Sequence, residues 1–520
     1  MRTKSALLAF VPFIIFSSTS TSGCRSSGGG GGASTPVVPG STAVPTLVFA
    51  LPSISASAVG PGDTLTATVA LANPNSASVS IQQALLVAQT PTGSSVDLAP
   101  VASATTIAAG GQLLYSASRV FGAQDPQGSW TVSASYLDQA GVWHVSSPVA
   151  FTVQPAPSPF VTVDRANARF LLGGKPFFFA ATNAYYLAQE HAYGSSVTLD
   201  ALDASKAVGV RVIRTIGYCD GYQVAGTNPN DPAIIQLTPG VYQPSGLAAI
   251  DFVVSEAGKR GIHLIITLVN NWTNYGGMQQ YVQWAGLTDH DAFFTNPNVK
   301  QLYKNYLRDF VTRTNGITGI AYKDDPTILS WELANEARCA SDPGAVRGVL
   351  ASWYQEMATY LKSVDPNHLV GTGEEGNDVS SAGYSSYSSG GWLDGTTGSS
   401  FRANIAVPAI DWGTVHVYPD NAGMSNALTD GSNWILDHVN LARAQGKPLV
   451  VGEYGLSTSP HSIYKSWLDV VESSGAAGAS LWQLVPQSRV AQAQEPTDVV
   501  YPTDPEVSAL SNDAAVMNAR

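Results

Sequence analysis

Two glutamates in the second half of the sequence are candidates for paired acid and base chemistry. Glu336 ends the apolar segment Trp331-Glu332-Leu333-Ala334-Asn335-Glu336, and Glu453 lies in Gly452-Glu453-Tyr454-Gly455. Hydrolysis of a glycosidic bond needs one acid to protonate the leaving oxygen and one carboxylate to attack the sugar carbon, about 5 to 5.5 Å apart where the configuration is retained. These residue types therefore indicate a glycosidase, provided that the fold brings the two glutamates together.

Further polar side chains end neighbouring apolar segments and could complete such a site. They are Asn183, Arg214, Asn270, Asn271, Asn335, Glu374, Glu375, His416, Trp482 and Gln483. A positive arginine would keep the attacking carboxylate ionised, whereas the acid needs a raised pKa, largely through its proximity to that negative charge.

Some polar residues near these segments have a simpler interpretation. Glu332 is expected to be a buried barrel carboxylate paired with a cation such as Arg211, and Glu374 is expected to support the site from behind. Three histidines are expected to be ordinary helix or strand residues: His263, His368 and His438.

Alternating apolar strands and helical patterns from Phe160 onward must position these residues. The eight strand candidates are Phe177 to Ala184, Val210 to Tyr218, His263 to Asn270, Ile328 to Glu336, Leu369 to Glu375, Trp412 to Tyr418, Pro448 to Tyr454 and Gly478 to Val485. Helical patterns between them include Gly246 to Arg260, Val299 to Thr314, Ala345 to Ser363, Asn426 to Gln445 and Ser462 to Ser473. Eight strands alternating with helices predict a (β/α)₈ barrel, in which active residues lie at the C-terminal strand ends.

Two segments of this region depart from the alternation. Residues 377–406 are rich in Ser and Gly and show no clear helix. Phe160 to Val163 and Phe170 to Leu172 predict a hairpin that covers the bottom of the barrel.

Several motifs in this order resemble glycoside hydrolase family 5, specifically its plant- and fungal-type β-mannanase branch. The resemblance covers Phe160 to about Val485. Besides the two glutamate segments it rests on Gly174-Lys175-Pro176-Phe177, Thr182-Asn183-Ala184-Tyr185-Tyr186, Val269-Asn270-Asn271-Trp272, Gly319 to Ile328 and Thr414-Val415-His416-Val417-Tyr418-Pro419. The sequence departs from the family at Ala337, where Pro is usual, and after Asp420, where a Trp is common.

The resemblance implies a role for each matching residue. Glu336 corresponds to the acid/base and Glu453 to the nucleophile, with no metal or cofactor. The other implied roles are Asn335 on the sugar 2-hydroxyl, Tyr418 and Arg214 on the nucleophile, His416 in the catalytic subsite, Trp482 as its aromatic floor, Arg338 on the leaving-group side, and Trp272 and Asn183 as further substrate contacts.

The sequence before the barrel predicts an exported protein with an additional module. A basic start, an apolar run from Ala6 to Phe16 and small polar residues are typical of a signal peptide over residues 1–23. Residues 24–44 are a Gly/Ser/Pro linker, and residues 45–155 show short alternating strands typical of an immunoglobulin-like β-sandwich. The sandwich is either a spacer or a carbohydrate-binding module. Residues 156–520 form the catalytic domain.

Cys24 and the two later cysteines leave alternatives open. Ser22-Gly23-Cys24 resembles a bacterial lipoprotein processing site, although Thr21 stands where Leu is usual. The protein is therefore either lipid-anchored at the cell surface or outer membrane, or simply secreted. Cys219 and Cys339 either pair or are buried free thiols.

Composition limits the class of partner. Lys plus Arg number 26 and Asp plus Glu 38, so the formal net charge is −12, and only 12% of residues are charged. Nucleic acids need clustered cations, so they are not expected as partners. The composition fits a neutral polysaccharide, and the family resemblance implies an endo-mannanase acting on β-mannan, expected as a monomer. The alternatives are an exo-β-mannosidase or a glycan-binding protein without catalysis.

Lipidation of Cys24 predicts a change in location for the Cys24→Ser variant. Without the acyl chains, the protein should move from the detergent-soluble membrane fraction to the medium or the periplasm, as measured by fractionation and immunoblotting. Unchanged partitioning would leave plain secretion as the interpretation.

Overall fold

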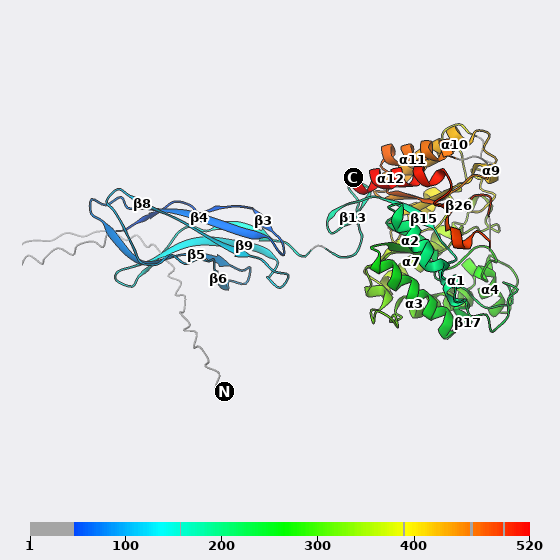
Figure 1. The fold of residues 1–520 in the computed structure, drawn as a ribbon, viewed down its shortest axis with the longest axis horizontal. Helices are drawn as coiled ribbons and strands as arrows, with labels where there is room; N and C mark the ends of the chain where they lie inside the picture. Colours follow the sequence, from blue (N-terminus) through cyan, green and yellow to red (C-terminus); the bar gives the residue numbers. More distant parts are fainter. Residues whose placement is uncertain (1–45, 157, 388–390, 458–460, 492–494) are drawn as a thin grey trace, which may run out of the picture. The chain divides into compact units, whose positions relative to one another are not determined.

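The computed structural model describes residues 46–156, 158–387, 391–457, 461–491 and 495–520. The chain divides into two compact units, Met1–Ala156 and Pro157–Arg520 (Figure 1). The expected signal peptide and Cys24 lie outside the described residues.

Over its described residues, 46–156, the first unit contains strands and no helix. Its strands are β1 (Val48–Phe49), β2 (Ser53–Ile54), β3 (Ala58–Val59), β4 (Thr64–Ala72), β5 (Val79–Gln89), β6 (Ser95–Asp97), β7 (Thr105–Ile107), β8 (Gln112–Val120), β9 (Gly128–Asp138), β10 (Trp143–Val145) and β11 (Val149–Val153). One sheet contains β1, β4, β2 and β8, and the other contains β3, β11, β9, β5, β6, β10 and β7.

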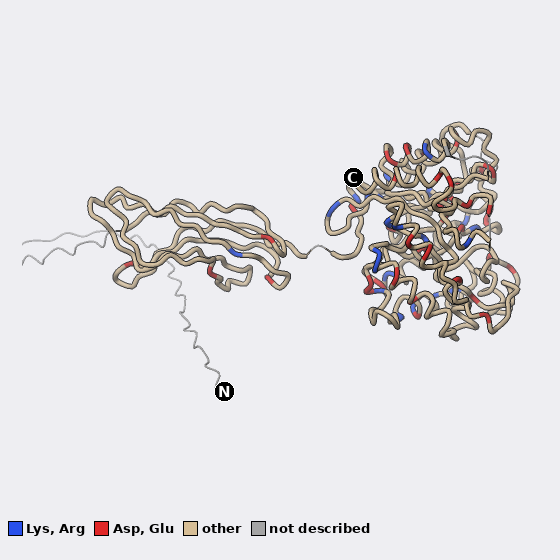
Figure 2. The backbone as a smooth tube through the Cα atoms, viewed as in Figure 1, with Lys and Arg blue, Asp and Glu red and all other residues tan. Residues whose placement is uncertain are grey.

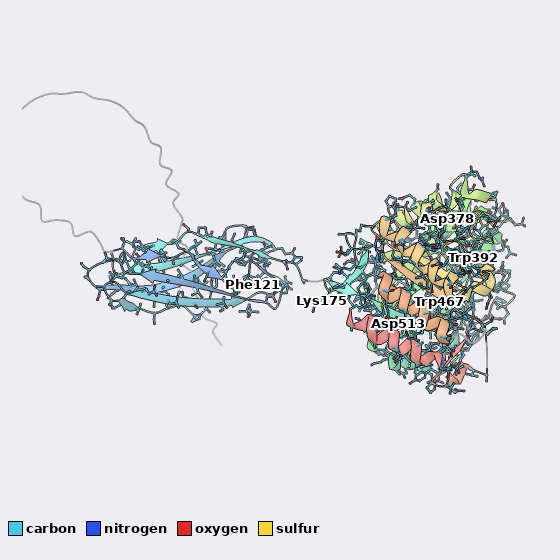
Figure 3. The ribbon with its side chains drawn as sticks, turned by 90° about the horizontal axis from the view of Figure 1, so that it is seen from above. Phe121, Lys175, Asp378, Trp392, Trp467 and Asp513 are labelled. Carbon is cyan, nitrogen blue, oxygen red and sulfur yellow. The ribbon has the colours of Figure 1, made fainter. Side chains whose placement is uncertain are left out.

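Alternation along these strands fills the core of the first unit. On β4, Leu65, Ala67 and Val69 are buried, while Thr66 and Thr68 between them are half-buried. Phe121, which Figure 3 labels, packs edge-on against Trp130 with 5.4 Å between ring centroids. Charged side chains are sparse in this unit compared with the second (Figure 2).

The second unit contains the expected parallel barrel, and each of the eight predicted segments holds one barrel strand. The barrel strands are β15 (Phe179–Asn183), β16 (Val212–Ile216), β19 (His263–Thr267), β20 (Ile328–Glu332), β21 (Leu369–Gly371), β22 (Gly413–Val417), β23 (Leu449–Tyr454) and β24 (Gly478–Leu481). They pair in the order β21-β20-β19-β16-β15-β24-β23-β22, and a parallel bridge between Gly371 and Trp412 joins the two outer strands. The sheet is therefore nearly closed, as in a (β/α)₈ barrel.

Helices follow the barrel strands along the chain and lie around the barrel (Figure 1). They are α1 (Leu187–Ala192), α2 (Val197–Ala207), α3 (Pro244–Lys259), α4 (Gly277–Trp284), α5 (Ala292–Thr295), α6 (Pro297–Val311), α7 (Val349–Val364), α8 (Phe401–Ile405), α9 (Pro419–Ala422), α10 (Ala427–Ala444), α11 (His461–Ser474) and α12 (Glu506–Ala519). Shorter elements are the 3-10 helices η1 (Tyr322–Asp324), η2 (Pro343–Ala345) and η3 (Gln487–Arg489), and the strands β17 (Gln236–Thr238), β18 (Val241–Tyr242), β25 (Leu484–Pro486) and β26 (Val499–Tyr501).

The five predicted helices correspond to α3, α6, α7, α10 and α11. Helix α6 begins two residues before its predicted start because the Asn296 side chain accepts hydrogen bonds from the first-turn amides and Pro297 occupies the first helical position. In the described part of 377–406, the only helix is the short α8.

The bottom of the barrel is covered by a small antiparallel sheet, as the hairpin prediction required. It consists of β12 (Thr162–Asp164), β13 (Arg169–Leu172) and β14 (Lys175–Phe177). Phe170 is fully buried and packs against Phe179 and Trp412 of the barrel, with ring centroids about 6 Å apart. This packing closes the end of the barrel that faces away from the catalytic candidates.

No helix within the described residues has the length and apolar character needed to span a bilayer.

Candidate active site

A cleft of about 1120 Å³ opens where the barrel strands end. Nine of the ten predicted site residues line it: Asn183, Arg214, Trp272, Asn335, Glu336, Arg338, Tyr418, Glu453 and Trp482. The tenth, His416, is fully buried beneath this surface on β22 and contacts Glu336. The polar residues predicted at the strand ends therefore lie together around one cleft.

The Arg214 guanidinium joins acceptors from several strands. On β16, its Nε donates to Glu332 Oε2 at 2.7 Å and its Nη1 to Glu453 Oε1 at 2.6 Å. Nη1 also donates to Asn183 Oδ1 at 3.1 Å, and Nη2 to Asn335 Oδ1 at 2.8 Å. Burial opposes the charged form, but the charges of Glu332 and Glu453 outweigh it and raise the pKa of Arg214. The arginine is thus a fixed cation beneath the cleft.

The predicted pairing of Glu332 with Arg211 is wrong. Arg211 precedes β16 at the bottom of the barrel, where its guanidinium lies 4.7 Å from the centre of the Phe177 ring. Glu332 is the last residue of β20, and Thr267 donates a second hydrogen bond to it at 2.7 Å. Arg214 is three residues further along β16 and reaches the level of Glu332.

Asn183 serves mainly to hold its neighbours. Its side chain is buried, and its Nδ2 donates to Gly452 O at 3.0 Å and to Ser480 Oγ at 2.9 Å. Its oxygen accepts from Arg214. These contacts tie Asn183 on the first barrel strand to the seventh and eighth strands, and Asn183 in turn holds the Arg214 guanidinium.

Glu453 is the last but one residue of β23 and is held from two sides. Arg214 binds one carboxylate oxygen, and the Tyr418 hydroxyl donates to the other at 2.7 Å. Burial raises the pKa of Glu453, while His416, Arg214 and the Tyr418 hydrogen bond oppose that rise. The carboxylate is therefore oriented with its outer face toward the cleft, which it lines.

Glu336 lies in the loop after β20 in a left-handed backbone conformation, with φ of 53°. Its amide donates to Gly373 O at 2.8 Å. Gly373 allows this approach, because a Cβ at that position would lie 1.9 Å from Ala334 O. Non-glycine residues adopt this region at a cost of about 1–3 kcal/mol, and such residues cluster at functional sites.

The Glu336 carboxylate accepts two hydrogen bonds in the substrate-free protein. Trp272 Nε1 donates to Oε2 at 2.6 Å, and His416 Nδ1 lies 2.7 Å from Oε1. Burial favours the neutral acid, but the His416 hydrogen bond and charge, with Trp272 and Arg338, hold the pKa of Glu336 at about 2. The raised pKa expected for Glu336 is therefore wrong for the free protein.

His416 can carry the proton that the ionised Glu336 carboxylate lacks. Burial disfavours the imidazolium, but the negative charge of Glu453 and the hydrogen bond and charge of Glu336 prevail and raise the pKa of His416. His416 Nδ1 also lies 3.7 Å from Glu453 Oε2. The histidine thus links the two carboxylates and can store the proton that Glu336 lacks.

Glu336, His416 and Glu453 are also the one group among the described residues with the donor types and spacing of a metal site. One ligand atom from each lies within 4.8 Å of the others. In this geometry His416 hydrogen-bonds to Glu336, and the two carboxylates also accept hydrogen bonds from Arg214, Tyr418 and Trp272. The arrangement fits proton exchange between two carboxylates.

A second ion pair supports the cleft wall beside Glu336. Arg338 binds both oxygens of Glu375, with Nε to Oε2 at 2.7 Å, and its guanidinium lies 5.1 Å from the centre of the Trp272 ring. Trp272 is 41% exposed, so one part of its ring is open to a ligand. Burial and the charge of Glu336 raise the pKa of Glu375 to about 7.

The opposite wall is formed by stacked aromatic rings. Tyr185 and Trp482 are nearly parallel, with ring centroids 5.5 Å apart. Trp482 Nε1 donates to Glu495 Oε2 at 2.7 Å. Glu495 was not predicted, since it lies in a loop after the eighth strand without an apolar run to mark it; Tyr275 and Trp392 also line the cleft and were missed for the same reason.

The remaining sequence predictions concern residues around the site. Cys219 and Cys339 are both buried free thiols. Glu374 is buried behind the site and accepts from Asn404 at 2.8 Å. Three histidines hydrogen-bond to backbone carbonyls within the barrel unit: His263, His368 and His438.

Comparison with known proteins gives the family. The model of the glycoside hydrolase family 5 β-mannosidase-like proteins matches residues 158–467. Mannan endo-1,4-beta-mannosidase 4 of Solanum lycopersicum is 39% identical over 356 residues, which are 63% of this chain and 84% of the relative.

Solved structures show the same relationship. The endo-beta-1,4-mannanase of Thermotoga petrophila is 33% identical with a TM-score of 0.61, over 66% of this chain and 78% of that one. The endo-1,4-beta-mannanase of Rhizomucor miehei is 32% identical with a TM-score of 0.60, over 69% of this chain and 100% of that one. The chain therefore belongs to the β-mannosidase-like proteins of glycoside hydrolase family 5 and is a glycoside hydrolase.

Proposed function

We propose that the protein is a retaining endo-β-1,4-mannanase acting on mannan, glucomannan or galactomannan. One observation carries the mechanism: an oxygen of Glu336 and an oxygen of Glu453 lie within 4.8 Å of each other at the ends of different strands. This separation suits direct attack by a carboxylate, whereas inverting enzymes hold their carboxyl groups about 6.5–9.5 Å apart to admit a water. The names of the related mannanases support the substrate.

In the first step, Glu453 attacks the anomeric carbon and the bond to the leaving sugar breaks. Arg214 and Tyr418 fix both oxygens of Glu453, so the attacking atom is held in place. The leaving oxygen takes a proton from Glu336. This proton originates on His416 Nδ1, 2.7 Å from Glu336 Oε1.

The charge of Glu453 coordinates the attack with the proton transfer. The charge of Glu453 is the largest single interaction that raises the pKa of His416. As Glu453 forms the covalent bond it loses this charge, so His416 holds its proton less strongly and releases it through Glu336 to the leaving oxygen. In the second step the ionised Glu336 takes a proton from water, whose oxygen attacks the anomeric carbon and frees Glu453.

Endo action is proposed because the cleft continues on both sides of the glutamates. Trp272 and Arg338 pack together after β19 and β20, and Tyr185 and Trp482 stack after β15 and β24. Sugars on both sides of the cut can then contribute binding energy to the reaction. An exo-β-mannosidase remains the alternative function, and a binding protein without catalysis would not need this carboxylate pair.

We further propose that residues 45–155 are an immunoglobulin-like spacer and that the mature protein is an exported monomer, tethered through lipidated Cys24. The Gly/Ser/Pro composition of residues 24–44 would give the enzyme reach from a membrane. The low content of charged residues suits a neutral polysaccharide.

Removal of either carboxylate tests the assigned roles. Glu453→Ala and Glu336→Ala should each lower kcat by a factor of about 10³ or more, because each removes a group that acts in the transition state. Azide should restore turnover of Glu336→Ala on an activated aryl mannoside and yield β-mannosyl azide. Calorimetry provides the folding control, and near wild-type activity in either variant would contradict the assignment.

The pH profile tests the stored proton. Because the pKa of His416 is raised, the wild-type enzyme should keep its acid proton above pH about 6.5, the ordinary value for histidine. Removing that reservoir in His416→Gln should shift the alkaline limb of kcat/KM on mannotetraose to lower pH, by about one unit or more. An unshifted alkaline limb would show that the proton does not depend on His416.

Arg338 tests endo action. Arg338→Ala should lose more activity on long manno-oligosaccharides than on aryl mannosides and should change the cleavage pattern, because the leaving-side contact exists only for sugar leaving groups. The wild-type enzyme should lower the viscosity of galactomannan before much mannose appears. Free mannose as the dominant first product would instead support the exo-mannosidase.

A further inference from the structure

We propose that Glu495 binds the sugar next to the cleavage-site sugar on its non-reducing side, and so sets the enzyme's requirement for a chain there. The inference rests on the proposed function. Glu495 lines the cleft but is not one of the residues assigned above to catalysis or to substrate contact.

The order of the barrel strands gives the cleft a direction. Glu453 lies one residue before the end of β23, Trp482 follows the neighbouring β24, and Tyr185 follows β15, which is next in the sheet. Glu336 and Trp272 follow β20 and β19, which lie across the barrel. The sugar that bonds to Glu453 therefore lies toward β23, β24 and β15, and the leaving group lies toward Glu336.

Glu495 lies on the Glu453 side, at the aromatic wall. Its Oε2 accepts from Trp482 Nε1 at 2.7 Å, and its Oε1 accepts from the Tyr185 hydroxyl at 3.3 Å. Because Tyr185 stacks beside Trp482, Glu495 bridges the polar edges of the two rings and lies at the rim of the ring that would carry the cleavage-site sugar. A sugar bonded to that one on its Tyr185 side would meet this carboxylate.

The Tyr185 hydroxyl is directed toward Glu495 by a third residue. Arg489 Nη2 donates to this hydroxyl at 3.2 Å, and the Arg489 guanidinium lies 3.8 Å from the centre of the Tyr186 ring. The hydroxyl accepts from Arg489, so its proton is available to Glu495. The carboxylate is consequently fixed before any ligand arrives, which lowers the entropy lost on binding.

The carboxylate still has acceptor capacity for a sugar. An ionised carboxylate offers about four lone-pair directions, and Trp482 and Tyr185 occupy one on each oxygen. Glu495 is half-buried and lines the cleft, so the free directions are accessible from it. Hydrogen bonds from sugar hydroxyls to a charged acceptor are shorter and stronger than those to a neutral one. Glu495 would therefore take a neutral sugar with free hydroxyls and repel an acidic one.

Two chromogenic substrates that differ by one sugar test the proposal. In Glu495→Gln, the amide oxygen can still accept from Trp482 Nε1, while the charge and an acceptor are lost. We expect kcat/KM on 4-nitrophenyl β-mannobioside to fall about 10- to 100-fold, mainly through KM, and kcat/KM on 4-nitrophenyl β-mannoside to fall less than about 3-fold. Glu356→Gln makes the same chemical change on the surface of α7, where Glu356 pairs with Lys300 and Lys304, and should alter neither.

Each other outcome overturns the inference in a recognisable way. An equal loss on both substrates would show that Glu495 acts only by orienting Trp482, and no loss on either would show that no sugar contacts it. A larger loss on the mannoside would show that Glu495 contacts the cleavage-site sugar itself and not the next sugar. Turnover of neither substrate, nor of polymeric mannan, by the wild-type enzyme would instead refute the proposed function itself. A melting temperature near that of the wild type controls for folding of Glu495→Gln.

Discussion

The buried Arg214 guanidinium is the interaction on which the site depends. It binds acceptors from β15, β20 and β23 and from the loop after β20. A cation buried this deeply needs full compensation, and removal of one partner of a buried pair costs about 3–5 kcal/mol. The barrel must therefore close in the register that brings Glu332, Asn183 and Glu453 to one level. The same contacts fix Asn335 and Glu453 relative to each other, so the stability of the barrel top and the geometry of the site have a common origin.

A second consequence of burial is that the pKa values of the charged groups in the site depend on one another. His416 is close to both Glu453 and Glu336, and each of these groups alters the pKa of its neighbour. In the proposed mechanism Glu336 has two opposing tasks, since it first donates and then accepts a proton. The low pKa of Glu336 suits the second task, and the raised pKa of His416 would supply the proton for the first.

The sequence was informative where a local pattern determines position. The eight apolar segments predicted the barrel strands, and the polar residues after them predicted the cleft. The contacts between side chains of different strands could not be predicted in the same way. Arg211 and Arg214 are three residues apart, yet only Arg214 reaches Glu332. The pKa of Glu336 depends on two residues from other strands: Trp272 follows β19, and His416 lies in β22. Glu495 follows no apolar run, so only the folded loop places it at the cleft.

In both walls of the cleft, the aromatic rings must be held at a fixed angle, and different residues do this in each wall. A flat aromatic ring binds a sugar only if it is exposed, but an exposed ring gains little packing to fix its angle. On the leaving side, the Arg338–Glu375 ion pair places a guanidinium against Trp272. On the other side, Glu495 and Arg489 hold Trp482 and Tyr185 through their polar atoms. In both cases charged groups orient the rings, and under the proposed function the same groups can hydrogen-bond to the hydroxyls of a neutral sugar. The charged groups of the two walls therefore fix the geometry of a surface whose proposed ligand is uncharged.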